Sequence, residues 1–165
     1  KIDPSLPTMI VFDLDDCLWT PEMHELYDAP TVPVKGKLNP ILIINSSSSS
    51  ISDDDGVVDS EEGTVGMSVP RRKGRGDQQK QIVTLYNGAR LALRELALDP
   101  KYKGVIIAVA SSSLEPSYSR LCLEAIEVLP GLTMKDMISY SQIGRSGKLS
   151  SRKTTHFQEL HQESG

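Results

Sequence analysis

The sequence predicts an α/β fold in which helices flank a parallel β-sheet. Residues 9–12 and 105–110 are continuous apolar runs, and runs without polar alternation are typical of strands buried on both faces. A strand pattern at 82–86 and an amphipathic helix pattern precede the second run, and this order favours a parallel crossover. A chain of 165 residues is long enough for one core, so we expect a single domain over 1–165.

Composition and charge narrow the class of protein. The formal net charge is −4 and the pI is about 5.4, so no basic field favours nucleic acid or an anionic membrane. No apolar run approaches the roughly 20 residues of a membrane span, and no secretory pattern opens the chain. The cysteines, Cys17 and Cys122, lie on separate predicted elements, which argues against a disulfide and favours a reducing compartment. We therefore expect a cytoplasmic monomer without nucleic-acid or membrane partners.

The first predicted strand leads directly into Asp13-Leu14-Asp15-Asp16. In open α/β sheets, ligands bind at the carboxyl ends of the strands, where Asp13 and Asp15 fall. One carboxylate there can attack phosphorus and form an aspartyl-phosphate, while a second protonates the leaving oxygen and then deprotonates water. Attacker and substrate are both anions, so this chemistry calls for a hard divalent cation, Mg²⁺, between them. The alternative interpretation of these four residues is a solvated strand end or a helix cap.

The segment after this loop divides into a flap and an insertion. Residues 20–37 carry scattered prolines in an irregular pattern, which predicts a loop and flap, and 38–45 contain a short β-rich run. In residues 46–79, serines, glycines and charged residues replace apolar ones. This composition offers too little apolar surface to offset the entropy of ordering the chain. We expect 46–79 to be a long disordered insertion.

Regular elements return after the insertion. A helix is predicted to begin at Asn87, because apolar residues follow at helical spacing, and to end at Asp99-Pro100. A second helix is predicted to begin at Pro116, with an apolar stripe that reaches Leu129. Cys122 lies on that stripe, which indicates a core residue rather than a nucleophile.

The last third of the chain is predicted to hold a strand, a loop and a helix. Residues 137–140 have the pattern of a short strand, and 141–151 form a loop rich in glycine and serine. A helix follows, and it contains His156 and His161. These histidines are five residues apart and do not share a face as zinc ligands at i and i+4 do, so we assign them to packing or the surface. His24, which has no matching partners, is interpreted in the same way.

Residues 9–19 resemble the first motif of the haloacid dehalogenase superfamily, an apolar strand followed by Asp-x-Asp-x-Thr or Val, although Cys17 stands in the Thr or Val position. The Leu-Trp that follows narrows the resemblance to the eukaryotic magnesium-dependent phosphatase family. This resemblance implies a haloacid dehalogenase-like Rossmannoid fold with a small flap rather than a large cap domain. It also implies that Asp13 is the nucleophile, that Asp15 is the acid and base, and that both hold Mg²⁺.

The resemblance assigns roles to residues farther along the chain. Ser111, after the second buried strand, matches a residue that binds a phosphoryl oxygen, and Ser112 stands where relatives often carry Arg. Lys153 precedes Thr-Thr-His-Phe and matches the lysine that pairs with the nucleophile and the phosphate; Lys148 and Arg152 are the alternatives. Without the resemblance, such serines indicate a turn or cap, and such a lysine indicates a solvated side chain.

The resemblance covers residues 7–35 and 82–165. The superfamily's fourth motif, an acidic pair after a fourth strand, would follow the helix of Lys153, but the sequence ends at Gly165. We therefore expect a domain that is incomplete at its carboxyl end, with a further acidic ligand of Mg²⁺ beyond Gly165.

Two functions are consistent with these patterns. The first is a magnesium-dependent phosphomonoester hydrolase with a flap, residues 20–44, over an open site. The resemblance suggests a phosphorylated small molecule, such as a sugar phosphate, or phosphotyrosine as the substrate. The second is a truncated phosphatase-like protein, catalytically weak or inactive, that acts as a binding module through its charged insertion.

Overall fold

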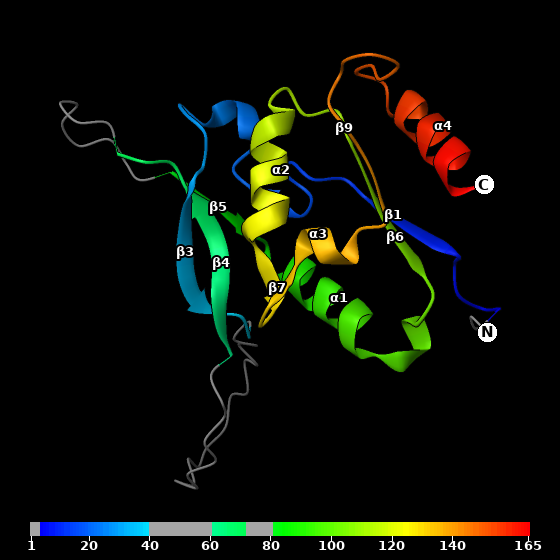
Figure 1. The fold of residues 1–165 in the computed structure, drawn as a ribbon, viewed down its shortest axis with the longest axis horizontal. Coiled ribbons are helices and arrows are strands. Elements are labelled where there is room, and N and C mark those ends of the chain that lie inside the picture. The colour runs from blue at the N-terminus through cyan, green and yellow to red at the C-terminus, as the bar shows by residue number, and fades with distance from the viewer. Residues whose placement is uncertain (1–3, 40–60, 72–80) are drawn as a thin grey trace, which may run out of the picture.

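The structure is a computed structural model that describes residues 4–39, 61–71 and 81–165 (Figure 1). A parallel sheet has the strand order β1-β6-β9, and an antiparallel sheet has the order β2-β5-β4-β3. The parallel sheet consists of β1 (Met9–Phe12), β6 (Ile106–Ser111) and β9 (Tyr140–Ile143). The antiparallel sheet consists of β2 (Trp19–Thr20), β3 (Val32–Lys37), β4 (Glu62–Ser68) and β5 (Ile82–Leu85). A small hairpin pairs β7 (Glu127–Leu129) with β8 (Leu132–Thr133).

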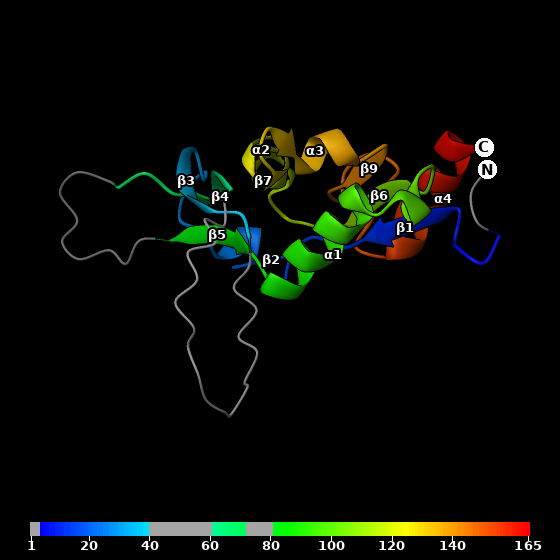
Figure 2. The ribbon, with the colours of Figure 1, turned by 90° about the horizontal axis from the view of Figure 1, so that it is seen from below.

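The two sheets lie at opposite ends of the molecule, with α2 and α3 between them (Figures 1 and 2). The α-helices are α1 (Asn87–Leu98), α2 (Pro116–Ala125), α3 (Met134–Met137) and α4 (Lys153–Ser164). Two short 3₁₀ helices are η1 (Met23–Glu25) and η2 (Pro100–Tyr102). The α/β fold class is confirmed. None of the helices in the described ranges combines the length and apolar character needed to cross a bilayer.

Strand β6 is buried on both faces, as its continuous apolar run predicts. Ala108 and Ala110 face α4, where they pack with Leu160. Val109 faces the opposite side and belongs to the main core with Cys122 and Leu123 of α2. The alternation of side chains along a strand therefore supplies both layers with apolar contacts. The register Met9↔Ile106 fixes β1 beside β6 in the parallel direction.

The antiparallel sheet corrects the prediction that 46–79 is disordered. Strand β4 lies inside that range and pairs with β3 on one side and β5 on the other. Its glycines are packing sites, since a Cβ on Gly66 would lie 2.4 Å from the Val83 carbonyl oxygen. Met67 is 4% exposed, so this polar-looking strand is part of the core. Residues 46–60 and 72–79 lie outside the described ranges.

Two other predictions about this sheet are wrong. Residues 82–85 do form a strand, but β5 pairs antiparallel with β2 and β4, so it does not start a parallel crossover to β6. Residues 32–37, predicted as part of a loop and flap, form β3. Both errors have one cause: β3 and β5 both pair with β4, which was not predicted to be a strand. Of the predicted run at 38–45, Leu38 is buried and 40–45 lie outside the described ranges.

Helix α2 ends earlier than predicted. It stops at Ala125, and residues 127–129 form β7, which turns at Gly131 with a φ of 74° into β8. The apolar stripe continues past the helix because Ile126 and Val128 alternate into the core as strand residues do. The strand predicted at 137–140 is also displaced. Thr133 and Asp136 form a capping box that starts α3, so β9 begins only at Tyr140.

Arg90 of α1 completes the hydrogen bonding of a bulge in β4. The pairing of β3 with β4 shifts at Val34/Lys35 and leaves Val65 without a partner in the register. Arg90 is 6% exposed and donates from Nη2 to the Val65 oxygen (3.1 Å) and from Nη1 to the Glu127 oxygen (2.8 Å). A bulge leaves one residue of a ladder unpaired, and the guanidinium replaces the missing donor.

We expect Arg90→Met to lower the free energy of unfolding by about 1–3 kcal/mol, because two carbonyl oxygens would lose a buried donor. Urea denaturation measures this change, with Lys103→Met on the exposed surface as the control. Equal stability of the two variants would contradict a role for Arg90 in holding the bulge.

Candidate active site

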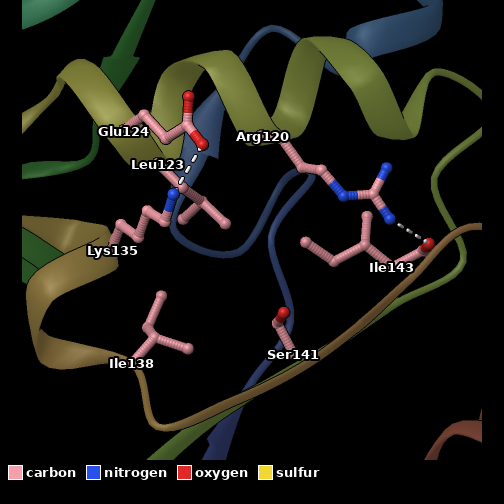
Figure 3. A pocket seen from close by; sticks show the side chains of 7 residues that line it. All are labelled: Arg120, Leu123, Glu124, Lys135, Ile138, Ser141 and Ile143. Carbon is pink, nitrogen blue, oxygen red and sulfur yellow. Dashed lines mark hydrogen bonds and ion pairs between the residues drawn. The ribbon is translucent and has the colours of Figure 1, made fainter.

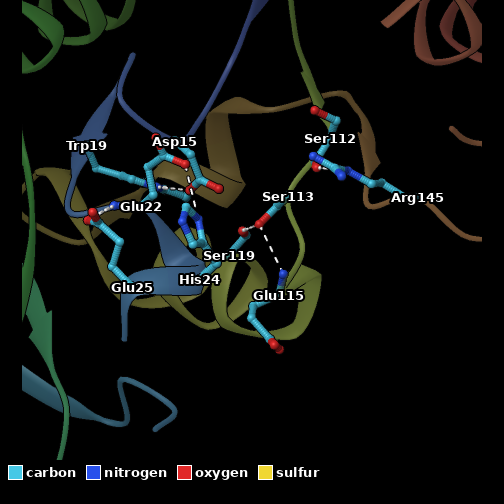
Figure 4. Close-up of polar contacts among 10 residues, drawn as sticks. All are labelled: Asp15, Trp19, Glu22, His24, Glu25, Ser112, Ser113, Glu115, Ser119 and Arg145. Atoms are coloured by element: carbon cyan, nitrogen blue, oxygen red, sulfur yellow. Dashed lines mark hydrogen bonds and ion pairs between the residues drawn. The ribbon is translucent and has the colours of Figure 1, made fainter. Parts of the chain in front are cut away.

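The candidate site begins at the carboxyl end of β1, where the chain turns sharply. The Leu14 carbonyl accepts the amides of Cys17 (3.2 Å) and Leu18 (2.9 Å), and Asp16 has a φ of 54°. Aspartate tolerates this left-handed conformation better than most residues. The turn lets Asp15 pair with Trp19, whose indole Nε1 donates to Asp15 Oδ1 (2.9 Å; Figure 4). Both Asp13 and Asp15 therefore line one cavity, as their spacing predicts.

Asp16 serves a different purpose from its neighbours. Its Oδ1 accepts a hydrogen bond from the Tyr86 hydroxyl (2.6 Å), and this bond raises the pKa of Tyr86. The carboxylate of Asp16 thus ties the loop to the residue before α1.

Lys153 contacts Asp13 although 140 residues separate them in the sequence. Asp13 Oδ2 pairs with Lys153 Nζ, and Asp13 Oδ1 accepts the Leu14 amide (2.9 Å). The alternative lysine, Lys148, instead pairs with Glu159 (3.5 Å). Arg152 is exposed at the amino end of α4, and no contact between its side chain and Asp13 is present. Of the three cations considered from the sequence, Lys153 is the one that reaches the site.

His156 holds the start of α4 in place. Its ring is fully buried, and Nε2 lies 2.9 Å from the Gly144 oxygen in the loop after β9. The side chain of Thr155 accepts the Ser150 amide (3.0 Å). These contacts fix the first turn of the helix, which carries Lys153. The assignment of His156 to packing is confirmed, and His161 is exposed.

Ser111 ends β6 and Ser112 follows it, beside the two carboxylates. Ser111 is 2% exposed, and its carbonyl accepts the Gly144 amide (2.9 Å). They border a cavity of about 200 Å³, whose lining residues are Asp13, Asp15, Glu22, His24, Ser111, Ser112, Ser113, Leu114 and Arg145. The structure thus gathers four of the predicted site residues around one cavity, and the fifth, Lys153, contacts Asp13.

Four lining residues with polar groups, Glu22, His24, Ser113 and Arg145, were not assigned to the site from the sequence. Glu22 caps η1 in the flap and His24 lies within η1, and His24 Nδ1 lies 3.2 Å from Glu22 Oε2. His24 is at the surface, as predicted, but at the rim of the candidate site. Arg145 comes from the loop predicted at 141–151, and a lone arginine among glycines and serines carries no signal of its own.

A larger cavity of about 280 Å³ lies between α2, α3 and β9 (Figure 3). Lys135 Nζ is paired with Glu124 Oε1 there (2.7 Å), and Arg120 Nη2 lies 3.5 Å from the Ile143 oxygen. The lining lacks the paired aspartates of the smaller cavity, so the smaller one is the candidate active site.

Cys122 is not a nucleophile, as predicted. Burial, and secondarily the Asp15 carboxylate, raises the pKa of its thiol to about 12. A thiol with this pKa stays protonated near neutral pH and reacts slowly.

The donor set of the site fits Mg²⁺. Asp13 and Asp15 offer carboxylate oxygens. In the described ranges, no cluster of three or more His, Cys, Asp or Glu side chains is placed to hold a metal. Mg²⁺ is commonly bound by one or two carboxylates together with waters and substrate phosphate oxygens. The two aspartates match this mode of binding rather than a cage made only of protein ligands.

The α/β fold and a lysine-paired aspartate at the end of β1 define a haloacid dehalogenase-like phosphatase. The model of the Acid Phosphatase family matches residues 5–165, and the chain belongs to this family. The resemblance seen in the motifs is therefore confirmed, and the match also spans the segment between them. No curated protein and no solved structure gives a significant match.

Proposed function

We propose that this phosphatase is a magnesium-dependent phosphomonoester hydrolase that acts through an aspartyl-phosphate at Asp13. The observation that carries the proposal is the ion pair between Asp13 and Lys153 at the cavity that Asp15 and Ser111 also line. These residues come from β1, β6 and α4, so the fold brings together groups with complementary chemical roles.

In the first step, a carboxylate oxygen of Asp13 attacks phosphorus, and the bond from phosphorus to the ester oxygen breaks. Asp15 gives a proton to the leaving oxygen. In the second step, Asp15 takes a proton from water, which attacks the phosphoryl group and releases inorganic phosphate and free Asp13. The indole of Trp19 occupies Oδ1 of Asp15, which leaves Oδ2 for proton transfer.

Charge is offset from two sources in this mechanism. The Lys153 ammonium stabilises the negative charge that gathers on Asp13 and the phosphoryl oxygens. Mg²⁺, held by Asp13 and by an oxygen of Asp15 other than the one that transfers the proton, would supply further positive charge toward the same oxygens. Ser111 and Ser112 are proposed to bind phosphoryl oxygens through hydroxyl or amide groups.

The proposed substrates are phosphotyrosine or a phosphorylated small molecule such as a sugar phosphate. Glu22 and His24, at the start of η1, line the cavity, so this part of the flap would contact the leaving group. Both cysteines are free, which supports a reducing compartment such as the cytoplasm. We propose a monomer without nucleic-acid or membrane partners.

We expect the chain to hydrolyse p-nitrophenyl phosphate with Mg²⁺, to lose this activity in EDTA, and to regain it when Mg²⁺ is restored. Release of p-nitrophenol measures the rate, and circular dichroism checks that the protein remains folded in EDTA. A folded chain without activity at any Mg²⁺ concentration would favour the alternative function, a binding module that acts through residues 46–79.

A further inference from the structure

The guanidinium of Arg145 reaches the candidate active site from the loop after β9. Its Nε donates to the Ser112 carbonyl (2.7 Å), and Figure 4 shows the side chain directed from its own loop toward Ser112. Both residues line the cavity with Asp13 and Asp15. Among the residues that the structure describes, no partner is present for Nη1 or Nη2 of Arg145. One edge of the guanidinium is therefore fixed, and the other is available to a ligand.

The backbone on both sides of the cavity holds Arg145 in this position. Strand β9 pairs with β6 up to Ser111↔Ile143, and the Gly144 amide extends the pairing to the Ser111 oxygen. Gly144 has a φ of 114°, a left-handed conformation that glycine adopts without strain and that turns the chain after the strand. The Gly144 carbonyl is in turn bound by His156 at 2.9 Å. Arg145 thus directly follows Gly144, whose position is fixed by hydrogen bonds to Ser111 of β6 and His156 of α4.

The charges around the cavity leave Arg145 as the available cation. Asp13, Asp15 and Glu22 contribute carboxylates to the lining, and the ammonium of Lys153 is paired with Asp13. Within the described part of the chain, Arg145 is the lining arginine or lysine without a carboxylate partner. An anionic substrate entering a cavity of carboxylates needs a compensating positive charge. A guanidinium edge with two parallel donors matches two oxygens of a phosphoryl group.

We propose that Arg145 binds the phosphoryl group of the substrate through Nη1 and Nη2, while Lys153 positions the nucleophile. The proposal rests on the proposed function for the identity of the substrate, a phosphomonoester. The two cations differ in what they contact, since Lys153 is held by Asp13 and Arg145 is held by a backbone carbonyl. Arg145 would therefore act on substrate binding, and Lys153 on the chemical step.

The test measures binding and turnover separately in Arg145→Gln and Arg145→Lys. Isothermal titration calorimetry gives the Kd of inorganic phosphate in the presence of Mg²⁺, and p-nitrophenyl phosphate gives kcat and KM. The matched control is Arg120→Gln, because Arg120 is also exposed and also lies near a backbone carbonyl, that of Ile143, but lines the other cavity. Thermal melts establish that all variants are folded.

We expect Arg145→Gln to raise both the phosphate Kd and KM by about tenfold to hundredfold, the range for losing charge-assisted hydrogen bonds, with kcat within about threefold. Arg145→Lys keeps the positive charge but loses the two parallel donors of the guanidinium, so its Kd and KM should lie between those of the parent chain and Arg145→Gln. Arg120→Gln should have the Kd and KM of the parent chain. An unchanged Kd and KM in Arg145→Gln, or a loss confined to kcat, would overturn the proposal.

Calorimetry also separates this proposal from the proposed function. If the parent chain binds phosphate but does not hydrolyse the ester, the proposed function is wrong, but the Kd of phosphate still tests the role of Arg145. Weaker phosphate binding by Arg145→Gln would then support that role. Equal binding by the variant and the parent, or no binding by the parent, would overturn it.

Discussion

Replacing Asp13 with Asn is expected to lower kcat for an aryl phosphate by about 10⁴-fold or more, because an amide cannot form the aspartyl-phosphate. The side chain keeps its shape, and its Oδ1 can still accept the Leu14 amide (2.9 Å). The loss would therefore reflect chemistry rather than a rearranged loop. Steady-state kinetics measures kcat, and acid quenching with ³²P-labelled substrate shows whether phosphate becomes covalently attached.

Asp16→Asn is the matched control for this prediction. It makes the same chemical change three positions later, at a carboxylate that faces Tyr86 (2.6 Å). Asparagine also accepts the left-handed backbone at this position, where φ is 54°. We expect activity within about threefold of the parent chain, the level of a substitution outside the reacting groups. Covalent labelling of Asp13→Asn, or comparable losses in the two variants, would rule out Asp13 as the nucleophile.

Much of the site could be predicted from the sequence because its chemistry lies at the ends of locally recognisable strands. The run that becomes β6 is buried on both faces, whereas the run that becomes β1, an edge strand, is only half-buried. Each run ends in polar residues at the same edge of the sheet. Asp13 and Ser111 therefore meet without any loop having to be predicted. Lys153 could be placed only through the motif around it, since a lysine at a helix start is otherwise a solvated residue.

The antiparallel sheet could not be predicted because β4, one of its two inner strands, does not have an apolar pattern. In β4, Gly63, Gly66 and Ser68 are buried, and their small size allows the neighbouring strands and side chains to approach. From composition alone, glycine and serine indicate disorder. In the folded chain, the pairing of β4 with β3 and β5 gives these residues a role in packing. The loop expected at residues 32–37 and the parallel crossover expected after β5 were wrong for the same reason, because the pairing of β3 and β5 depends on β4.

The contribution of Arg145 was hidden by a different cause. Its position depends on the register of β9 against β6 and on the direction in which the chain turns at Gly144. The glycines of this segment predict a loop, but they do not predict that register or that direction. The sequence did indicate that a cation is missing from the site, because Ser112 stands where members of the family often carry Arg. The structure places a guanidinium against the carbonyl of that residue from another loop.

Lys153→Gln is expected to lower kcat by about 10²–10³-fold, the range for removing one preorganised donor from a developing negative charge. The ammonium contacts Asp13 from the first residue of α4, a helix whose start is fixed by His156. Glutamine can donate a hydrogen bond to Asp13 but carries no charge, so the loss should fall mainly on kcat. Lys153→Arg keeps the charge and should recover part of the rate.

Lys148→Gln is the control for the loss of a lysine near the site. Lys148 is 75% exposed at its side chain and pairs with Glu159 at 3.5 Å, so it should contribute little. The kinetics of Lys153→Gln and Arg145→Gln can then be compared directly, because the first should lower kcat and the second should raise KM. If Lys153→Gln raised KM without changing kcat, the ammonium would bind the substrate in the ground state, and the division of roles between the two cations would be wrong. If the separation is found, the cavity holds one cation for the nucleophile and one for the phosphoryl group. This arrangement would account for an anionic substrate reacting among three carboxylates.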